Sequence, residues 1–268
     1  MNDFIVNTRN HLSYLTFSPF ERLPFLKHAF SMRLTYPPLP AEHRPLPDVR
    51  NEGNNTEQDF LGALGISLES LVTLQQVHGN QCQKVFRSQL KQIQGTAGDS
   101  LLTSDHGIAL GVRTADCFPV LMLEPERKAI SCTHAGWRSL ANRILDNCLE
   151  LMIKDFSCHP SSIVAAIGPG IDKCCYKVRE DVLKEFEKSR ISVQSFISQA
   201  EDDSFYLDLK AIIIEQLSLH GLSQNHIHPS SLCTFCSPLP LPSFRKEGRQ
   251  AGRILSVIML SEKDTNAP

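Results

Sequence analysis

The sequence predicts an α+β fold with mixed α/β layers, because short apolar runs typical of buried strands are interspersed with segments of helical periodicity. The strand-like runs include residues 71–74, 129–133 and 163–167, and Glu180–Lys188 is a typical helical segment. At 268 residues the chain can bury a large core, and no clear linker divides it. We therefore expect one domain over residues 1–268.

In the first half of the chain, residues 1–50 are expected to be partly loop-like because they contain a proline cluster that cannot form continuous helix. The cluster consists of Pro37, Pro38, Pro40, Pro45 and Pro47. A short helix is expected over residues 57–65, followed by a strand at 71–74. Residues 99–123 suit two strands, with a bend at 114–118 between them.

In the second half, an amphipathic helix is expected after Gly136. Its apolar face would consist of Leu140, Ile144, Leu145, Cys148, Leu149 and Met152. Asp208 can cap a further helix that stops before Gly221, and Ile254–Leu260 is the last expected strand. The amide groups at the start of the helix after Gly136 are a candidate phosphate or oxyanion site.

Composition and charge restrict the classes of partner. A formal net charge of −2 gives no general attraction to nucleic acid or to anionic membranes. The sequence has no apolar stretch long enough to span a membrane, and nine cysteines, an odd number, suit reduced thiols better than a disulfide framework. We expect a cytoplasmic protein that acts on a small molecule, with no nucleic-acid or membrane partner.

Three residues offer the donor set of a catalytic zinc site: His78, Cys117 and His134. Zinc accepts nitrogen and sulfur ligands, and catalytic sites use three protein ligands so that water or substrate can take the fourth position. Each residue lies near the end of an apolar run, as expected for strands that deliver side chains to one rim. Taken singly, each has an ordinary structural reading, and Cys117 with His134 could also be the nucleophile and base of a metal-independent hydrolase or deamidase.

Two further groups are candidates for binding. Arg245 and Arg253 lie near the last strand, just before it in the chain, where they could clamp a phosphate, although ordinary surface charge also explains them. The pairs Cys174-Cys175 and Cys233-x-x-Cys236 could assemble a four-thiolate zinc site, or the second pair could cycle as a dithiol. Structural thiols are the default reading, because adjacent cysteines rarely give ideal tetrahedral geometry and the chain has no second Cys-x-x-Cys motif.

Ordered motifs over roughly residues 70–260 resemble the YfiH family of laccase-domain, or multicopper polyphenol oxidase-like, proteins. They are QVHG (76–79), GDSLLT (98–103), TADCFPVL (114–121), HAGWR (134–138), IGPGI (167–171), CYKV (175–178), YLDL (206–209), CT (233–234), SFRK (243–246) and GR (252–253). The resemblance implies phosphorolysis of adenosine, inosine, guanosine and methylthioadenosine, with adenosine deamination as a side activity. It makes His78, Cys117 and His134 the metal ligands, usually for zinc.

The older oxidase label suits the residues less well. Several coppers need repeated His-x-His pairs, and the chain has one, His226-Ile227-His228. Copper can nevertheless bind a single site of this kind. The chain also departs from the family pattern at Thr56-Glu57, where an Asn-Arg pair is usual, and at Phe244 and Lys246, where the family has Tyr and Arg.

The implied mechanism assigns further roles. Phosphate would bind at the open metal position, aided by Arg245 and Arg253. Asp99 is the candidate for an acid/base contact near the metal, or it orients a ligating histidine. The departures from the family pattern also keep open a noncatalytic metal-binding module.

Overall fold

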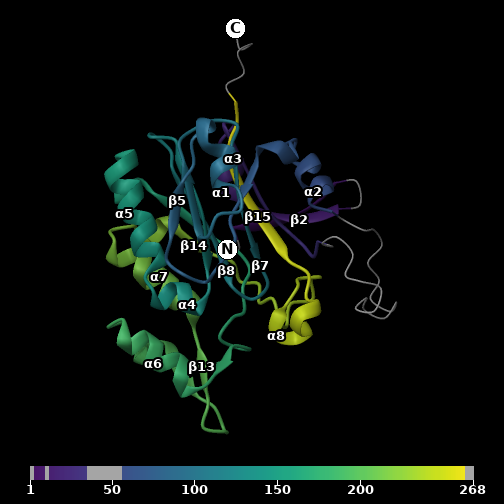
Figure 1. Ribbon diagram of the computed structural model, residues 1–268. Helices are drawn as coiled ribbons and strands as arrows, with labels where there is room; N and C mark the ends of the chain where they lie inside the picture. The colour runs from purple at the N-terminus through teal and green to yellow at the C-terminus, as the bar shows by residue number, and fades with distance from the viewer. Residues whose placement is uncertain (1–2, 10–11, 35–55, 263–268) are drawn as a thin grey trace.

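The computed structural model describes residues 3–9, 12–34 and 56–262, whose strands form two six-stranded sheets and one three-stranded sheet (Figure 1). The first sheet has the spatial order β1 (Phe4–Arg9), β2 (Leu12–Phe17), β3 (Leu26–Ser31), β15 (Ile254–Leu260), β7 (Ala109–Thr114) and β4 (Leu71–Thr73). The second has the order β14 (Ile227–Pro229), β10 (Val164–Ile167), β8 (Phe118–Glu124), β9 (Ala129–Ala135), β6 (Ser100–Thr103) and β5 (Cys82–Lys84). The small third sheet has the order β11 (Lys177–Val178), β13 (Phe205–Leu207) and β12 (Ile197–Gln199).

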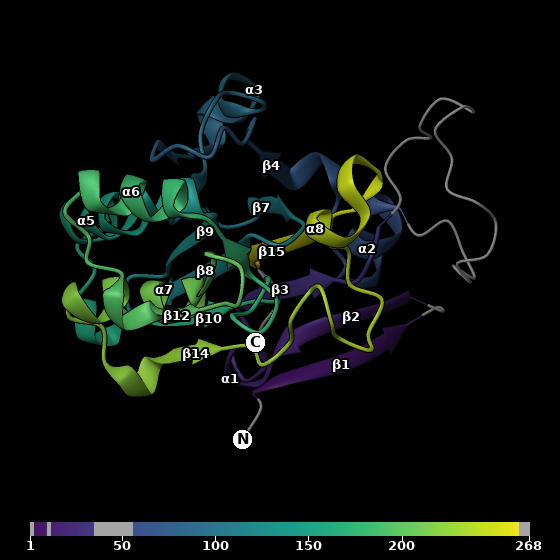
Figure 2. The ribbon, with the colours of Figure 1, turned by 90° about the horizontal axis from the view of Figure 1, so that it is seen from below.

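The helices lie outside the two large sheets. They are α1 (Ser18–Glu21), α2 (Glu57–Ala63), α3 (Leu90–Ile93), α4 (Trp137–Ala141), α5 (Ile144–Phe156), α6 (Glu180–Lys188), α7 (Leu209–Leu219) and α8 (Phe244–Glu247). Figure 2 shows α5, α6 and α7 on one flank and the β1–β2 hairpin on the other. None of the helices in the described ranges is long and apolar enough to cross a membrane.

The central strands are buried on both faces. In β15, Ile254 and Ile258 join the core between the two large sheets, whereas Leu255 and Val257 pack toward α2. In β8, Leu121 and Leu123 face the same inter-sheet core, and the alternate residues face α5 and α7. This alternation follows from the two-residue period of a strand, and it gives the mixed α/β layers that the sequence predicted.

Several expected elements are confirmed. The helix predicted at 57–65 is α2, which Thr56 and Asp59 begin with a reciprocal capping box. Helix α6 and strand β15 have the predicted bounds, and the Asp208 side chain caps α7 by accepting from the Ala211 N–H at 2.9 Å. The bend at 114–118 lies between β7 and β8, and β6 is an additional strand before them.

The prediction of a single helix after Gly136 is wrong, because this segment forms two helices. Helix α4 ends at Ala141, and Arg143 then adopts a left-handed conformation with φ of 62° before α5 starts. A residue with a left-handed backbone cannot continue a right-handed helix, so α4 and α5 are separate elements. The apolar face is buried as predicted, with Leu140 on α4 and the other members on α5.

The N-terminal region contains strands that the sequence analysis did not identify. Strands β1, β2 and β3 extend the first sheet as antiparallel neighbours. The proline cluster from Pro37 to Pro47, on which the loop expectation for residues 1–50 rested, lies outside the described residues.

Candidate metal centre

His78, Cys117 and His134 come together at the place where the two large sheets meet. One ligand atom from each lies within 4.8 Å of the other two. The Cys117 Sγ is 3.9 Å from His78 Nε2, and the two imidazole rings are 4.7 Å apart at 78°. Residues from three separate segments therefore present one sulfur and two nitrogens to a common point.

The loop after β4 positions His78. Its backbone is left-handed, with φ of 57°, which is uncommon outside glycine and is frequent at functional sites. Just before it, the Gln76 side chain donates to the Arg113 carbonyl and accepts from the Arg113 N–H, both at 2.8 Å. These two bonds fasten the loop to β7, and the His78 side chain itself is exposed.

The turn from β7 to β8 positions Cys117, and it carries the chain from the first sheet to the second. Asp116 in this turn has φ of 86° and is buried. Its carboxylate accepts from the Thr234 hydroxyl at 2.7 Å and from the Arg245 backbone N–H at 2.6 Å. The turn is therefore held by segments more than a hundred residues away in the chain.

Strand β9 positions His134, which is 2% exposed. Its Nδ1 lies 2.8 Å from Asp99 Oδ1. Because an ionised carboxylate can only accept, Nδ1 donates this bond, and Nε2 is the nitrogen that can bind a metal in exchange for its proton.

Asp99 is fully buried and accepts four hydrogen bonds. Oδ1 accepts from His134 Nδ1 and from the His78 N–H at 3.0 Å, and Oδ2 accepts from the Gly79 N–H at 2.7 Å and the Val77 N–H at 3.3 Å. Burial opposes the charged form, but the bonds from His134 and the backbone outweigh it and hold the pKa of Asp99 below its usual range. One carboxylate thus orients two of the three candidate ligands.

The charges favour the thiolate form of Cys117. Burial opposes ionisation, yet the neighbouring His134 and His78 lower the pKa of Cys117 to about 6. Burial likewise opposes the charged form of His134, but Cys117 and Asp99 raise the pKa of this imidazole to about 9. The thiolate is the form of cysteine that binds metals and that acts as a nucleophile.

The residues fit a metal. Two imidazoles and one thiolate suit zinc or copper, and three ligands leave a coordination position open. Gly136 leaves room for this centre, because a Cβ there would lie 2.8 Å from Cys117 Sγ and 3.3 Å from His78 Cδ2. A phosphate or oxyanion site was also expected at this turn. Helix α4 gives it little support, because a helix of five residues has little aligned dipole.

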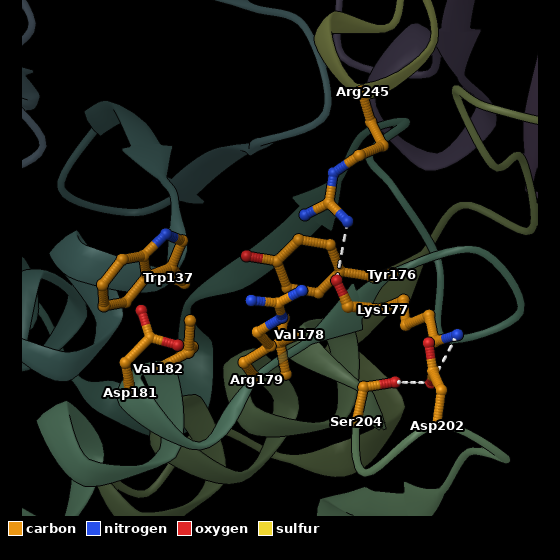
Figure 3. A pocket seen from close by; sticks show the side chains of 10 residues that line it. All are labelled: Trp137, Tyr176, Lys177, Val178, Arg179, Asp181, Val182, Asp202, Ser204 and Arg245. Carbon is orange, nitrogen blue, oxygen red and sulfur yellow. Dashed lines mark hydrogen bonds and ion pairs between the residues drawn. The ribbon is translucent and has the colours of Figure 1, made fainter.

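A cavity of about 330 Å³ lies beside α4 and β11 (Figure 3). It is lined by Trp137, Tyr176, Lys177, Val178, Arg179, Asp181, Val182, Asp202, Ser204 and Arg245. Trp137 directly follows Gly136, which contacts Cys117, and the Arg245 backbone N–H donates to Asp116 beside Cys117. The cavity therefore adjoins the candidate metal centre, although none of the three candidate ligands lines it.

The two predicted arginines have different places. Arg245 lines the cavity, where its guanidinium donates to the Lys177 carbonyl at 2.6 Å and lies 5.2 Å from the Tyr176 ring centre. Arg253 does not line it, and its guanidinium bonds the carbonyls of Ala251 and Gly252.

The other cavity residues were not predicted from the sequence to have a role. Trp137 and Tyr176 belong to motifs that carried the resemblance, so their presence in those motifs was the available signal. Arg179 follows the CYKV motif directly and gave no signal of its own.

Residues 46–261 match the family described as multi-copper polyphenol oxidoreductase laccase. A Geobacillus stearothermophilus protein named purine nucleoside phosphorylase YlmD is 32% identical over 226 residues, 81% of this chain and 82% of that protein. A Clostridium acetobutylicum protein named purine nucleoside phosphorylase is 34% identical over 163 residues, 60% of this chain and 66% of that protein. A protein named adenosine deaminase RL5, from an unknown prokaryotic organism, is 28% identical over 204 residues, 73% of this chain and 77% of that protein.

Solved structures share the fold. The crystal structure of YlmD from Geobacillus stearothermophilus superposes with a TM-score of 0.80 at 27% identity, covering 97% of this chain and 100% of that one. The crystal structure of the Bacillus licheniformis hypothetical protein YfiH gives a TM-score of 0.82 at 24% identity, with the same coverage of both chains.

Proposed function

The chain belongs to the family described as multi-copper polyphenol oxidoreductase laccase, and we propose that within it this protein is a zinc-dependent purine nucleoside phosphorylase. The substrates would be adenosine, inosine, guanosine and methylthioadenosine, together with phosphate. The observation that carries the proposal is a three-ligand His/Cys/His centre beside a cavity whose walls carry aromatic side chains and charged side chains of both signs, with cations in excess. The names of the relatives support the same reaction class.

His78, Cys117 and His134 would hold the zinc ion. Bound there, zinc would supply a Lewis acid at an open position, which suits a phosphate oxygen. The role of Cys117 is to contribute a thiolate, and that of His134 is to present Nε2 while its Nδ1 stays bonded to Asp99.

The cavity residues would bind the nucleoside and phosphate. Trp137 and Tyr176 offer aromatic faces on which a purine can stack. Arg245 and Arg179 place positive charge on the same cavity, which favours phosphate and charge development as the glycosidic bond breaks. Arg253 does not line the cavity. It would affect phosphate binding indirectly, because its guanidinium holds the segment that precedes β15.

For Asp99 we propose the second of the two roles that the sequence left open. Its carboxylate is fully buried and its two oxygens already accept four bonds. It is therefore a positioning residue that orients His78 and His134, and it has no free face toward a substrate.

Adenosine deamination is the second candidate function, favoured by the relative named adenosine deaminase. The same open position could activate water toward the purine ring. A multicopper oxidase is disfavoured, because His/Cys/Asp/Glu side chains within the described ranges form two groups able to hold a metal, and only one of them contains histidine. His228 of the single His-x-His pair is instead bonded to Asp3 at 2.8 Å.

We further propose that residues 1–268 act as one catalytic domain in the cytoplasm. All nine cysteines are free, which suits a reducing compartment. The partners would be small molecules, without nucleic acid or membrane.

The test is release of hypoxanthine from inosine, with and without phosphate, by protein whose zinc and copper content is measured. Phosphate-dependent release that Cys117→Ala abolishes, together with the metal of this site, is the expected result. Cys82→Ser is the control for loss of a single thiol, since Cys82 lies in β5 and belongs to neither group of candidate ligands.

The alternatives give different results in this assay. A metal-independent Cys/His hydrolase would keep its activity after chelation, need no phosphate and lose activity on thiol alkylation. A noncatalytic metal-binding module would hold metal without turnover of any nucleoside.

A further inference from the structure

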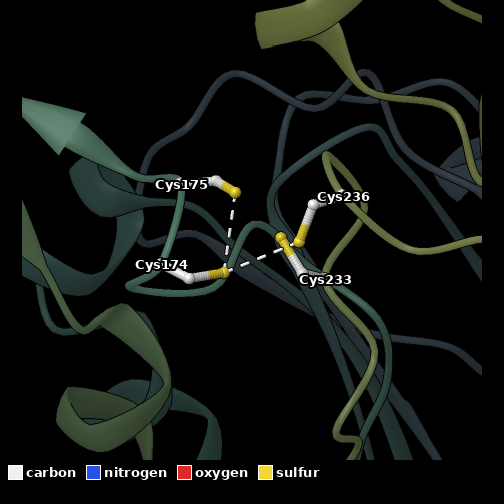
Figure 4. A group of neighbouring side chains, drawn as sticks. All are labelled: Cys174, Cys175, Cys233 and Cys236. Atoms are coloured by element: carbon white, nitrogen blue, oxygen red, sulfur yellow. Dashed lines mark hydrogen bonds between the residues drawn. The ribbon is translucent and has the colours of Figure 1, made fainter.

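A second group of metal-binding side chains lies outside the His/Cys/His centre. Cys174 and Cys175, between β10 and β11, face Cys233 and Cys236, which follow β14 (Figure 4). All four sulfurs lie within 4.8 Å of one another. The Cys174 sulfur is 3.5 Å from that of Cys175 and 3.7 Å from that of Cys236.

These separations suit a tetrahedral metal. A Zn–S bond of about 2.3 Å places the sulfurs of a regular tetrahedron about 3.8 Å apart. The separations of 3.5 and 3.7 Å differ from this value by a few tenths of an ångström, and no pair of sulfurs exceeds it by more than about 1 Å. All four thiols are free, so no disulfide competes for them.

The local backbone explains how two adjacent cysteines point in one direction. The Asp172 carbonyl accepts from the N–H groups of Cys175 at 2.9 Å and Tyr176 at 3.0 Å, which closes a tight turn around Cys174. The turn brings both sulfurs to the side that faces the second segment (Figure 4). This removes the geometric objection to adjacent ligands.

The segment from Cys233 to Cys236 forms a turn. The Ser237 N–H donates to the Cys233 carbonyl at 2.9 Å and closes it. The Cys233 sulfur accepts from the Asp172 N–H at 3.4 Å. Backbone N–H groups aimed at a sulfur favour its thiolate form, which is the form that binds metal.

Other contacts hold the two segments together without the sulfurs. Gly170 and Cys233 form a parallel bridge, and the Thr234 N–H donates to the Gly170 carbonyl at 3.0 Å. From α7, the Lys210 ammonium donates to the Asp172 carboxylate on one segment and to the Ser230 carbonyl on the other. The four sulfurs are therefore preorganised rather than brought together by chance at a loop tip.

We propose that these four cysteines bind one zinc ion as a closed, structural tetrathiolate site. Four protein ligands leave no open position, in contrast to the His/Cys/His centre. The site would fasten the wall of the cavity, because Tyr176 directly follows one ligand pair. It would also hold Thr234, which lies between the other two ligands and donates to Asp116 beside Cys117.

The experiment is zinc counting by mass spectrometry on the full chain after gel filtration. Wild-type protein should carry about two zinc ions per chain, and Cys236→Ser about one, because a closed site needs all four ligands. His78→Ala should also carry about one, from the tetrathiolate site alone. Cys82→Ser is the matched control and should keep the wild-type zinc content.

Cobalt(II) substitution identifies which site is lost. The intense thiolate-to-cobalt absorption of a four-sulfur site should persist in His78→Ala and disappear in Cys236→Ser. Because Cys236 is exposed, its replacement leaves no core cavity, and Cys174→Ser, also exposed, is a second variant with the same expected loss.

Three results would overturn the proposal. They are equal zinc content in Cys236→Ser and wild-type protein, a disulfide within the cluster in protein purified under reducing conditions, and iron in place of zinc at the four sulfurs. Zinc at the tetrathiolate site with no phosphorolysis would leave this proposal supported while refuting the proposed function.

Discussion

Asp99→Asn tests whether a single carboxylate organises the metal centre. The wild-type oxygens divide four donors between them: His134 and His78 on Oδ1, and Gly79 and Val77 on Oδ2. Asparagine has one oxygen, so its amide nitrogen must face two N–H donors in either orientation.

The cost follows from those contacts. If the amide nitrogen replaces Oδ2, the part-buried N–H groups of Gly79 and Val77 lose their acceptor, which lowers the free energy of unfolding by at most about 1–3 kcal/mol for each bond. If it replaces Oδ1, His134 can accept at Nδ1 only by moving its proton to Nε2, the atom that would bind metal. Loss of such a supporting contact typically weakens metal binding 10–100-fold, or about 1.4–2.7 kcal/mol.

Two measurements check this prediction: zinc affinity by competition with a chromophoric chelator, and urea-induced unfolding of the metal-free protein. Asp155→Asn is the matched control, because Asp155 makes an exposed ion pair with Lys84 that should contribute little. Wild-type zinc affinity together with wild-type stability in Asp99→Asn would refute the assignment of Asp99 as the positioning residue.

Three further predictions concern the pH dependence of stability, the space beside Cys117 and the positive charge that binds phosphate. Burial lowers the pKa of His28 from its ordinary value of 6.5 to about 4, so the unfolded chain takes up this proton first as pH falls. As pH falls from 6.5 to 4, the free energy of unfolding should drop by about 1.4 kcal/mol per pH unit because of this residue. Urea unfolding of His28→Gln at several pH values should lack this contribution to the pH dependence of stability. Gly136→Ala should weaken zinc binding in the chelator assay, since its methyl group would lie 2.8 Å from the ligand sulfur, whereas Gly62→Ala, with nothing within 4 Å, should bind zinc as wild type does. Arg245→Gln should raise the KM for phosphate about tenfold or more without loss of zinc, because a charge-assisted hydrogen bond contributes about 1.5–3 kcal/mol. An unchanged KM, or an equal rise in the exposed control Arg249→Gln, would remove Arg245 from phosphate binding.

Elements with strong local signals were predictable from the sequence. Helix α6 has a clear amphipathic pattern, and β15 is a continuous apolar run, so both were predicted with their observed bounds. Strand β1 is largely exposed, and an edge strand of this kind carries little hydrophobic periodicity. The break at Arg143 depends on a left-handed residue that propensity does not mark as a helix end.

The candidate ligands were predictable because each follows or ends an apolar run, and strand ends gather at one rim of a sheet. The supports around them were not. The bonds from Asp116 to Thr234 and Arg245 join residues far apart in the chain, and no local pattern specifies such pairs. The cysteine cluster shows the same limit, since its geometry depends on how the turn at Asp172 meets the Cys-x-x-Cys segment.

The departure from the family pattern at Glu57 gains a physical meaning in the fold. Its carboxylate accepts from Arg113 Nε at 2.6 Å and from Nη2 at 2.8 Å, a two-point ion pair between α2 and β7. The backbone of Arg113 is in turn bonded on both sides by Gln76, two residues before His78. An acidic residue at position 57 therefore supports the strand to which the His78 loop is fastened, and it cannot supply positive charge to a phosphate. If an arginine at this position contributes such charge in other family members, we expect the cations on the cavity wall, Lys177, Arg179 and Arg245, to supply it here.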